Sequence, residues 1–385
     1  MEGFDRYRSE FPITKNHTFM DHAAISPPPA RVVRAVERLF REFSNHGIDC
    51  YPHWLKRIEE VRHLFAMLIH AEPNEIAFVG NTSEGLSIIA TGLNWKNGDV
   101  VLIPVPEFPA NVYPWMNLER RGIRVQLIQR KNGRFTIKDL DKSLDSKTRL
   151  ITVSSVDFAT GYRCDLEALG DFCQRKGLLL CVDAIQSLGV IPIDVKRCGI
   201  HFLAAGGHKW LLSTMGCGGL FISKEVNHLI HPDRVGWKSV VEEEEFFKLH
   251  FELKPDAQRF EPGTMNVAGI YALGAAIELL LEVEVEKIYP YVLALCNQLF
   301  EGLKDRDLKI LTPMGEDERS GILSFIPSSD PKSLYHFMTE NKIMLSLREG
   351  MIRLSPHFYN NREDIDFFFK CLDRFLGLTP QDLEA

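Results

Sequence analysis

The sequence lacks the features that mark membrane, secreted or nucleic-acid-binding proteins. No apolar stretch in its 385 residues approaches the roughly 18 residues of a membrane span. The start, residues 1–6, has no apolar region of the kind found in signal peptides. The formal net charge of −7 comes without a run of lysine and arginine that could follow a phosphate backbone. We therefore expect a soluble, cytoplasmic protein that binds neither membranes nor nucleic acid.

Paired metal ligands and paired cysteines are also missing. The eight cysteines include no C-x-x-C pair, and several lie in apolar runs where a thiol is simply a small buried side chain. No H-E-x-x-H motif is present. We expect free thiols and no metal site.

Short apolar runs rich in β-branched residues recur between helical patterns, and this order predicts an α/β fold. Seven such runs argue for a mostly parallel seven-stranded sheet covered by helices on both faces. Active sites in such sheets form where the carboxyl ends of the strands open. The predicted strands are Glu75–Gly80, Val100–Val105, Ile123–Gln129, Leu150–Val156, Leu178–Asp183, His201–Ala205 and Gly218–Ile222.

The length of the chain exceeds the usual limit for one core, and the pattern changes from about Lys254 onwards. We predict a large domain over residues 15–255 and a smaller α+β C-terminal domain over 256–385, with residues 1–14 packing on the smaller one. Its expected elements are a long helix near Ile270–Val285, strands at Ile322–Ile326 and Met351–Leu354, and a closing helix around Glu363–Leu376.

Two short segments carry the chemistry. Asp183 ends one apolar run, and Lys209 follows the next in Gly206-Gly207-His208-Lys209-Trp210. The pair would lie at one edge of the sheet, as pyridoxal phosphate requires. A buried carboxylate keeps the pyridine nitrogen protonated, and a desolvated lysine holds the aldehyde as a Schiff base and carries protons. If a helix begins just after Asp183, Gln186 lies one turn away and can hydrogen-bond the ring hydroxyl.

With Met20-Asp21-His22-Ala23-Ala24 near the start and Arg353 near the end, these motifs resemble the class V aminotransferases of pyridoxal phosphate fold type I. That family includes cysteine desulfurases and isopenicillin N epimerase. The resemblance covers nearly the whole chain. It implies a homodimer whose active sites are shared between subunits.

The resemblance also implies roles for individual residues, most of which have a purely structural alternative. Thr82 and Ser83, at a strand-to-helix junction, would bind the cofactor phosphate, or form an ordinary helix cap. Phe108 would stack on the cofactor ring, or be a core phenylalanine. Gly207 and His208 match phosphate contacts, although His208 could be a buried structural imidazole. Gly263 and Thr264 match a loop that reaches the partner's phosphate, or form a plain turn.

The substrate side is assigned in the same way. Arg353, in an R-x-S-x-x-x-Y-N pattern, matches the arginine that clamps the substrate carboxylate, and a surface charge is the alternative. His22, Ala23 and Trp237 match substrate-side positions, where histidine and tryptophan can also be structural.

The pattern departs from cysteine desulfurases in two places. Residues 329–352 contain no cysteine, and Phe108 stands where those enzymes carry a histidine that can move protons. Persulfide formation is therefore disfavoured, because serine cannot replace a thiolate in that step. Transamination is the first expectation, since one lysine suffices to move the proton. Epimerisation, with His22 as second proton donor, and a C–S lyase of the selenocysteine type are the alternatives.

The sequence fits two other classes of protein less well, a nucleotide-binding α/β enzyme and a binding-only relative. A nucleotide-binding α/β enzyme would need a phosphate loop, but Gly80–Gly85 is followed by leucine where that loop needs lysine. A binding-only relative would be expected to have lost its lysine, and Lys209 is retained.

Overall fold

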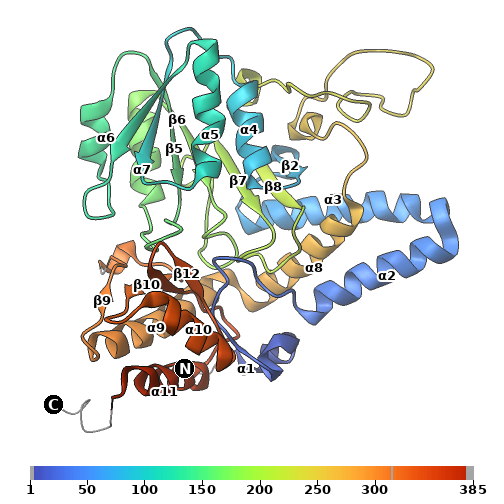
Figure 1. Ribbon diagram of the computed structural model, residues 1–385. Coiled ribbons are helices and arrows are strands. Elements are labelled where there is room, and N and C mark those ends of the chain that lie inside the picture. The colour runs from blue at the N-terminus through green and yellow to red at the C-terminus, as the bar shows by residue number, and fades with distance from the viewer. Residues whose placement is uncertain (1–3, 314, 379–385) are drawn as a thin grey trace.

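Seven strands form one sheet in the order β2-β8-β7-β6-β5-β3-β4 (Figure 1). The computed structural model describes residues 4–313 and 315–378. Strand β8 runs antiparallel to β2 and β7, and the other pairings are parallel. The predicted α/β fold is confirmed, and each predicted run contains a strand or most of one. The strands are β2 Ile76–Val79, β3 Val100–Val105, β4 Arg124–Gln129, β5 Thr148–Ser154, β6 Leu179–Asp183, β7 Phe202–Gly206 and β8 Gly218–Ile222.

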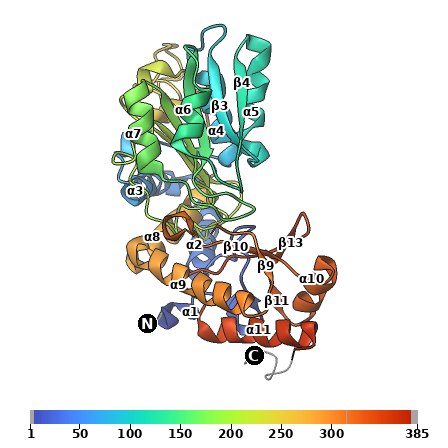
Figure 2. The ribbon, with the colours of Figure 1, turned by 90° about the vertical axis from the view of Figure 1, so that its left-hand side faces the viewer.

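The central strands are buried on both faces, which explains why they read as continuous apolar runs. In β6, Leu180 and Val182 belong to one core cluster, whereas Leu179 and Cys181 belong to another. This alternation follows from the two-residue period of a strand. Helices cover both faces (Figure 2). One face packs against α3 Tyr51–Leu68, α7 Leu166–Lys176 and α8 Val267–Val283, and the other against α4 Thr82–Gly92 and α5 Tyr113–Met116.

Helix α4 approaches β7 unusually closely, and this approach places its first residue beside the end of the strand. A Cβ atom on Gly85 would lie 2.9 Å from that of Ala204 in β7, so a larger residue would push the helix away. As a result, Thr82 Oγ1 accepts a hydrogen bond from the backbone N–H of Gly206 at 2.9 Å. The glycine therefore positions the helix start at the carboxyl end of the sheet.

A smaller domain lies beside this edge of the large sheet (Figures 1 and 2). Its antiparallel sheet has the order β12-β13-β10-β9. The strands are β9 Lys309–Ile310, β10 Leu323–Ile326, β12 Ser346–Arg348 and β13 Met351–Leu354, and the helices are α9 Val285–Lys304, α10 Pro331–Glu340 and α11 Arg362–Leu376. The remaining elements include α1 Asp5–Arg8, α2 Ala30–His46, α6 Ile137–Ser143 and the parallel pair β1 Thr18–Phe19 and β11 Ile343–Met344.

The N-terminal segment contacts the smaller domain. Arg8 forms a 2.9 Å ion pair with the buried carboxylate of Asp364, and Phe11 stacks on Tyr359 with ring centroids 3.8 Å apart. The predicted domain boundaries remain a prediction, and residues 1–3 and 379–385 of those ranges lie outside the described chain. None of the described helices combines the length and the apolar character that a membrane crossing needs.

Candidate active site

Lys209 and Asp183 come from neighbouring strands whose carboxyl ends meet. Asp183 is the last residue of β6 and pairs in register with Ala204 of β7, and Lys209 follows β7 by three residues. Asp183 is buried, and its side chain accepts one hydrogen bond within the described chain, from the Ile185 N–H at 3.0 Å. Lys209 Nζ forms no ion pair or hydrogen bond with the described residues and lies 5.6 Å from the centroid of the Phe108 ring.

Burial disfavours the charged form of both groups. It lowers the pKa of Lys209, an effect that the charge of Asp183 opposes and that the charges of Arg353 and Arg348 reinforce. Burial likewise raises the pKa of Asp183. The hydrogen bond from Ile185 opposes this shift, and the charge of Glu107 reinforces it. A lysine with a lowered pKa supplies a neutral amine. A buried carboxyl that accepts only one hydrogen bond from the described chain favours a cationic N–H partner.

The start of α4 lies beside the segment before Lys209. Asn81 caps the helix by accepting from the Glu84 N–H, and the dipole at the helix start favours an anion. Thr82 is buried at this point and Ser83 is exposed. A Cβ atom on Gly206 would lie 3.2 Å from the ring of His208 and 3.4 Å from Thr82 Oγ1, so glycine lets these side chains pack closely at the helix start.

The other predicted neighbours of the cofactor differ in how they are held. Phe108 is 41% exposed and packs edge-on against Phe158 at 5.2 Å. Gln186 lies in turns rather than in a helix. Its side-chain Nε2 donates to the Ala23 carbonyl at 3.0 Å, and its Oε1 accepts from the Trp210 indole N–H at 2.9 Å. The Gly207 N–H donates to the Cys217 carbonyl at 2.8 Å, which gives this glycine a packing role.

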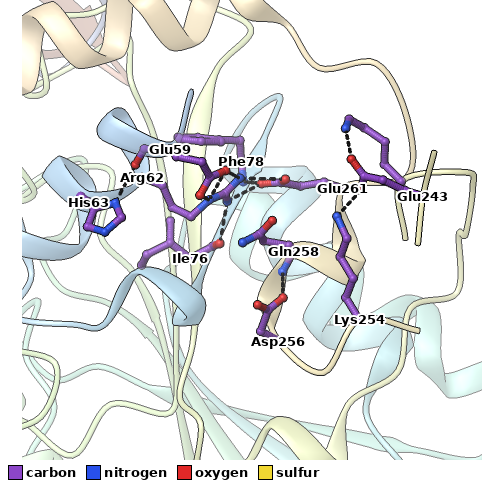
Figure 3. A network of polar contacts seen from close by, with 11 residues as sticks. Glu59, Arg62, His63, Ile76, Phe78, Glu243, Lys254, Asp256, Gln258 and Glu261 are labelled. Carbon is purple, nitrogen blue, oxygen red and sulfur yellow. Dashed lines mark hydrogen bonds and ion pairs between the residues drawn. The ribbon is translucent and has the colours of Figure 1, made fainter. Parts of the chain in front are cut away.

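Gly263 and Thr264 lie in a loop that a buried ion pair fixes. Arg62 of α3 donates to both carboxylate oxygens of Glu261, at 2.7 and 3.0 Å, and also to the Ile76 carbonyl (Figure 3). Trp237 is 41% exposed, with its indole nitrogen 3.8 Å from where a Cβ on Gly263 would lie. Trp237 therefore belongs with the Gly263 loop rather than with the contacts of Lys209.

Arg353 extends from β13 of the smaller domain to the large domain. Its Nη1 donates to the Phe158 carbonyl at 2.7 Å, and its Nη2 donates to Ser346 Oγ at 3.2 Å and pairs with Asp21 at 3.5 Å. Ser346 Oγ in turn donates to the Asp21 carboxylate at 2.5 Å. Burial lowers the pKa of Arg353, and the nearby Asp21 opposes that shift.

His22 and Ala23 lie in a buried part of the chain. The His22 ring is fully buried, with Nδ1 2.8 Å from the Ser355 carbonyl and Nε2 2.8 Å from the Tyr359 hydroxyl. Burial, reinforced by His357, holds its pKa well below the usual range. Both ring nitrogens of His22 therefore have partners, and Ala23 is buried beside it; their substrate-side role stays a prediction.

A buried polar network beneath Phe108 was not predicted. Glu107 accepts hydrogen bonds from the Phe108 N–H at 2.6 Å and from the Ser154 hydroxyl at 2.7 Å. Arg130 pairs with Glu107 at 3.5 Å and with Asp157 at 2.8 Å. Arg130 and Asp157 each follow a predicted strand, so the rule that sites form at carboxyl ends could have found them.

These residues fit pyridoxal phosphate. The helix start at Thr82 suits its phosphate, the Lys209 amine, which has no ion pair or hydrogen bond among the described residues, suits its aldehyde, and the buried Asp183 carboxyl suits its pyridinium nitrogen. Fold and site together define a pyridoxal phosphate enzyme of fold type I.

Comparisons with known proteins agree with this class of enzyme. The family described as aminotransferase class V matches residues 18–368, and the chain belongs to it. A probable cysteine desulfurase from Methanothermobacter thermautotrophicus is 30% identical, over 96% of this chain and 98% of the relative. The uncharacterized aminotransferase YcbU from Bacillus subtilis is 30% identical, over 94% and 95%. The apo structure of a cysteine desulfurase from Thermococcus onnurineus superposes with a TM-score of 0.88 at 25% identity, over 98% and 99%.

Proposed function

We propose that this enzyme is an aminotransferase that acts at the Cα atom of an amino acid. The observation that carries the proposal is a chain of contacts: Lys209 lies beside the Phe108 ring, Phe108 packs against Phe158, and the Phe158 carbonyl binds Arg353. Asp183 ends the strand next to the one that precedes Lys209, and residues 329–352 contain no cysteine. Pyridoxal phosphate, when bound, draws electrons from the bonds at Cα. The side chains of the chain itself must then bind the substrate, hold the cofactor's charge and move one proton.

Each of the three residues supports one of these tasks. The neutral amine of Lys209 would accept the proton from Cα, acting as a general base. It would then donate this proton to the aldehyde carbon of the cofactor, acting as a general acid. Asp183 stabilises the positive charge on the ring nitrogen from a buried position. Arg353 binds the substrate carboxylate with its guanidinium and so fixes which Cα bond is activated.

The same geometry speaks against the epimerase alternative. Inversion at Cα needs proton donors on both faces of the substrate, and Phe108, which lies over Lys209, has no proton to give. His22, the other candidate, has both ring nitrogens occupied. One lysine is enough for transamination.

A persulfide-forming desulfurase is also disfavoured. All eight cysteines are buried, and burial raises the pKa of seven of them, among them Cys164 and Cys198. The β12–β13 hairpin, which contains the proposed clamp Arg353, carries Arg348 and Glu349 at its turn instead of a thiol. A C–S lyase that needs no protein thiol remains the second candidate, because the relative from Methanothermobacter is named a probable cysteine desulfurase.

The assembly is proposed to be a homodimer. Phe246, Phe247, Leu249 and Phe251 are 64–105% exposed in the loop that precedes Glu261. Such apolar side chains support an interface with a second copy, close to the Gly263 loop.

A paired assay tests the reaction. The purified holoenzyme is given single amino acids with a 2-oxo acid acceptor, and new amino acid, sulfide and Cα deuterium exchange are measured together. Transamination predicts a new amino acid. Arg353→Gln should lower kcat/KM by roughly 30- to 5000-fold, the loss expected when one partner of a charged pair is removed. Sulfide release from cysteine without amino transfer would instead establish the lyase.

A further inference from the structure

Arg348 lies at the tip of a hairpin that faces the proposed site. It ends β12, and the turn to β13 is made by Glu349 and Gly350, both with positive φ. The hairpin projects from the smaller domain towards the large one (Figure 2). Ser346 is directly opposite Arg353, and Arg348 is directly opposite Met351.

This register puts Arg348 and Arg353 on the same face of the hairpin. Residues two apart in a strand point to the same side, so Arg348 shares the face of Ser346, whose hydroxyl contacts Arg353 and Asp21. Diagonal neighbours on one face of an antiparallel pair are roughly 7–8 Å apart. Leu347 between them packs on the opposite side, against the core.

The two arginines differ in what they bind. Arg353 is buried and held by Phe158, Ser346 and Asp21. Arg348 is exposed and forms neither an ion pair nor a hydrogen bond within the described chain. Its charge nevertheless acts on the site, because it helps to lower the pKa of both Lys209 and Arg353.

The unpaired charge of Arg348 favours a second anion. Arg353 pairs with Asp21 and the charge of Asp183 acts on Lys209, whereas no acidic side chain of the described residues pairs with Arg348. A substrate with one carboxylate would occupy the proposed clamp and leave the Arg348 guanidinium without an anionic partner. An amino acid with an acidic side chain would give each arginine one carboxylate. The planar guanidinium group of arginine can bind a carboxylate with two parallel hydrogen bonds.

We propose that Arg348 recognises a second carboxylate of the substrate, so that the site takes dicarboxylic amino acids and their 2-oxo acids. This inference rests on the proposed function for the role of Arg353. It makes Arg348 a determinant of specificity rather than of the chemical step.

The test compares ligands that differ in one carboxylate. Glutarate and butyrate are titrated into the holoenzyme by calorimetry, and glutamate and alanine are compared as amino donors. The wild type should bind glutarate at least tenfold more tightly than butyrate. Arg348→Gln should lower glutarate affinity and kcat/KM for glutamate roughly 10- to 100-fold, while the values for butyrate and alanine change less than threefold. Arg348→Lys should retain part of the preference, and Arg120→Gln, at another exposed arginine, should have no effect.

Several outcomes separate the two proposals. Equal affinity for glutarate and butyrate in the wild type, or an equal loss for both ligands in Arg348→Gln, would overturn the role of Arg348. A glutarate preference that depends on Arg348 in an enzyme that performs no amino transfer would support Arg348 and refute the aminotransferase.

Discussion

Replacing Asp183 with asparagine removes a charge from the proposed cofactor site and leaves the shape of the side chain unchanged. Asp183 is 1% exposed, and its Oδ1 accepts the Ile185 N–H at 3.0 Å. An asparagine oxygen can keep that hydrogen bond. Because burial already raises the pKa of Asp183, the cofactor-free protein should lose no stability in the variant and can gain some.

The loss should therefore fall on the loaded enzyme. Removing one partner of a buried, hydrogen-bonded charge pair costs about 2–5 kcal/mol. At about 1.4 kcal/mol per factor of ten, this corresponds to a decrease of roughly 30- to 5000-fold in kcat/KM.

The assay compares steady-state kinetics and thermal unfolding of Asp183→Asn with those of Asp305→Asn, a change at an exposed carboxylate after α9. Neither variant should unfold at a lower temperature than the wild type, and only the first should lose activity. If Asp183→Asn kept more than a tenth of the wild-type kcat/KM, or if both properties fell together, the assignment of Asp183 as the partner of the ring nitrogen would be refuted.

Three further predictions address the loop, the lysine and the thiols. Arg62→Met should destabilise the protein by about 3–5 kcal/mol, because the variant leaves the Glu261 carboxylate buried and unpaired. Arg57→Met, which removes a more exposed ion pair from the same helix, should cost less than about 1 kcal/mol. Equal melting temperatures for the two variants would contradict this prediction. In cofactor-free protein the pKa of Lys209 is lowered from 10.5, so the unfolded chain binds more protons between the lowered value and 10.5, and stability should rise with pH in that window. Lys209→Met should weaken this rise, and an unchanged pH slope in thermal melts would count against a buried amine. Iodoacetamide should leave native activity intact because all eight cysteines are buried, and rapid inactivation would reveal a reactive thiol.

Much of the fold could be predicted because its signals are local. The β6 and β7 runs are continuous and apolar, as strands buried on both faces must be. The position of Asp183 and Lys209 at one edge followed from the parallel order of those strands, with no knowledge of distant contacts.

The parts that could not be predicted depend on contacts between distant segments. His22 is locked by Ser355 and Tyr359, which lie 333 and 337 residues further along the chain, and no local pattern distinguishes such a histidine from a free one. Arg353 is held by the Phe158 carbonyl, 195 residues away. The absence of a helix after β6 was likewise not evident, because turns and a helix start have similar sequences around Gln186.

Covalent trapping can show whether Lys209 and Asp183 serve one cofactor. The holoenzyme is reduced with borohydride and digested, and its peptides are mapped by mass spectrometry, with Lys209→Ala and Asp183→Asn treated in parallel. We expect a phosphopyridoxyl group on the peptide that contains Lys209, none in Lys209→Ala, and the same attachment with little activity in Asp183→Asn. A label on another lysine, or one that persists in Lys209→Ala, would contradict it.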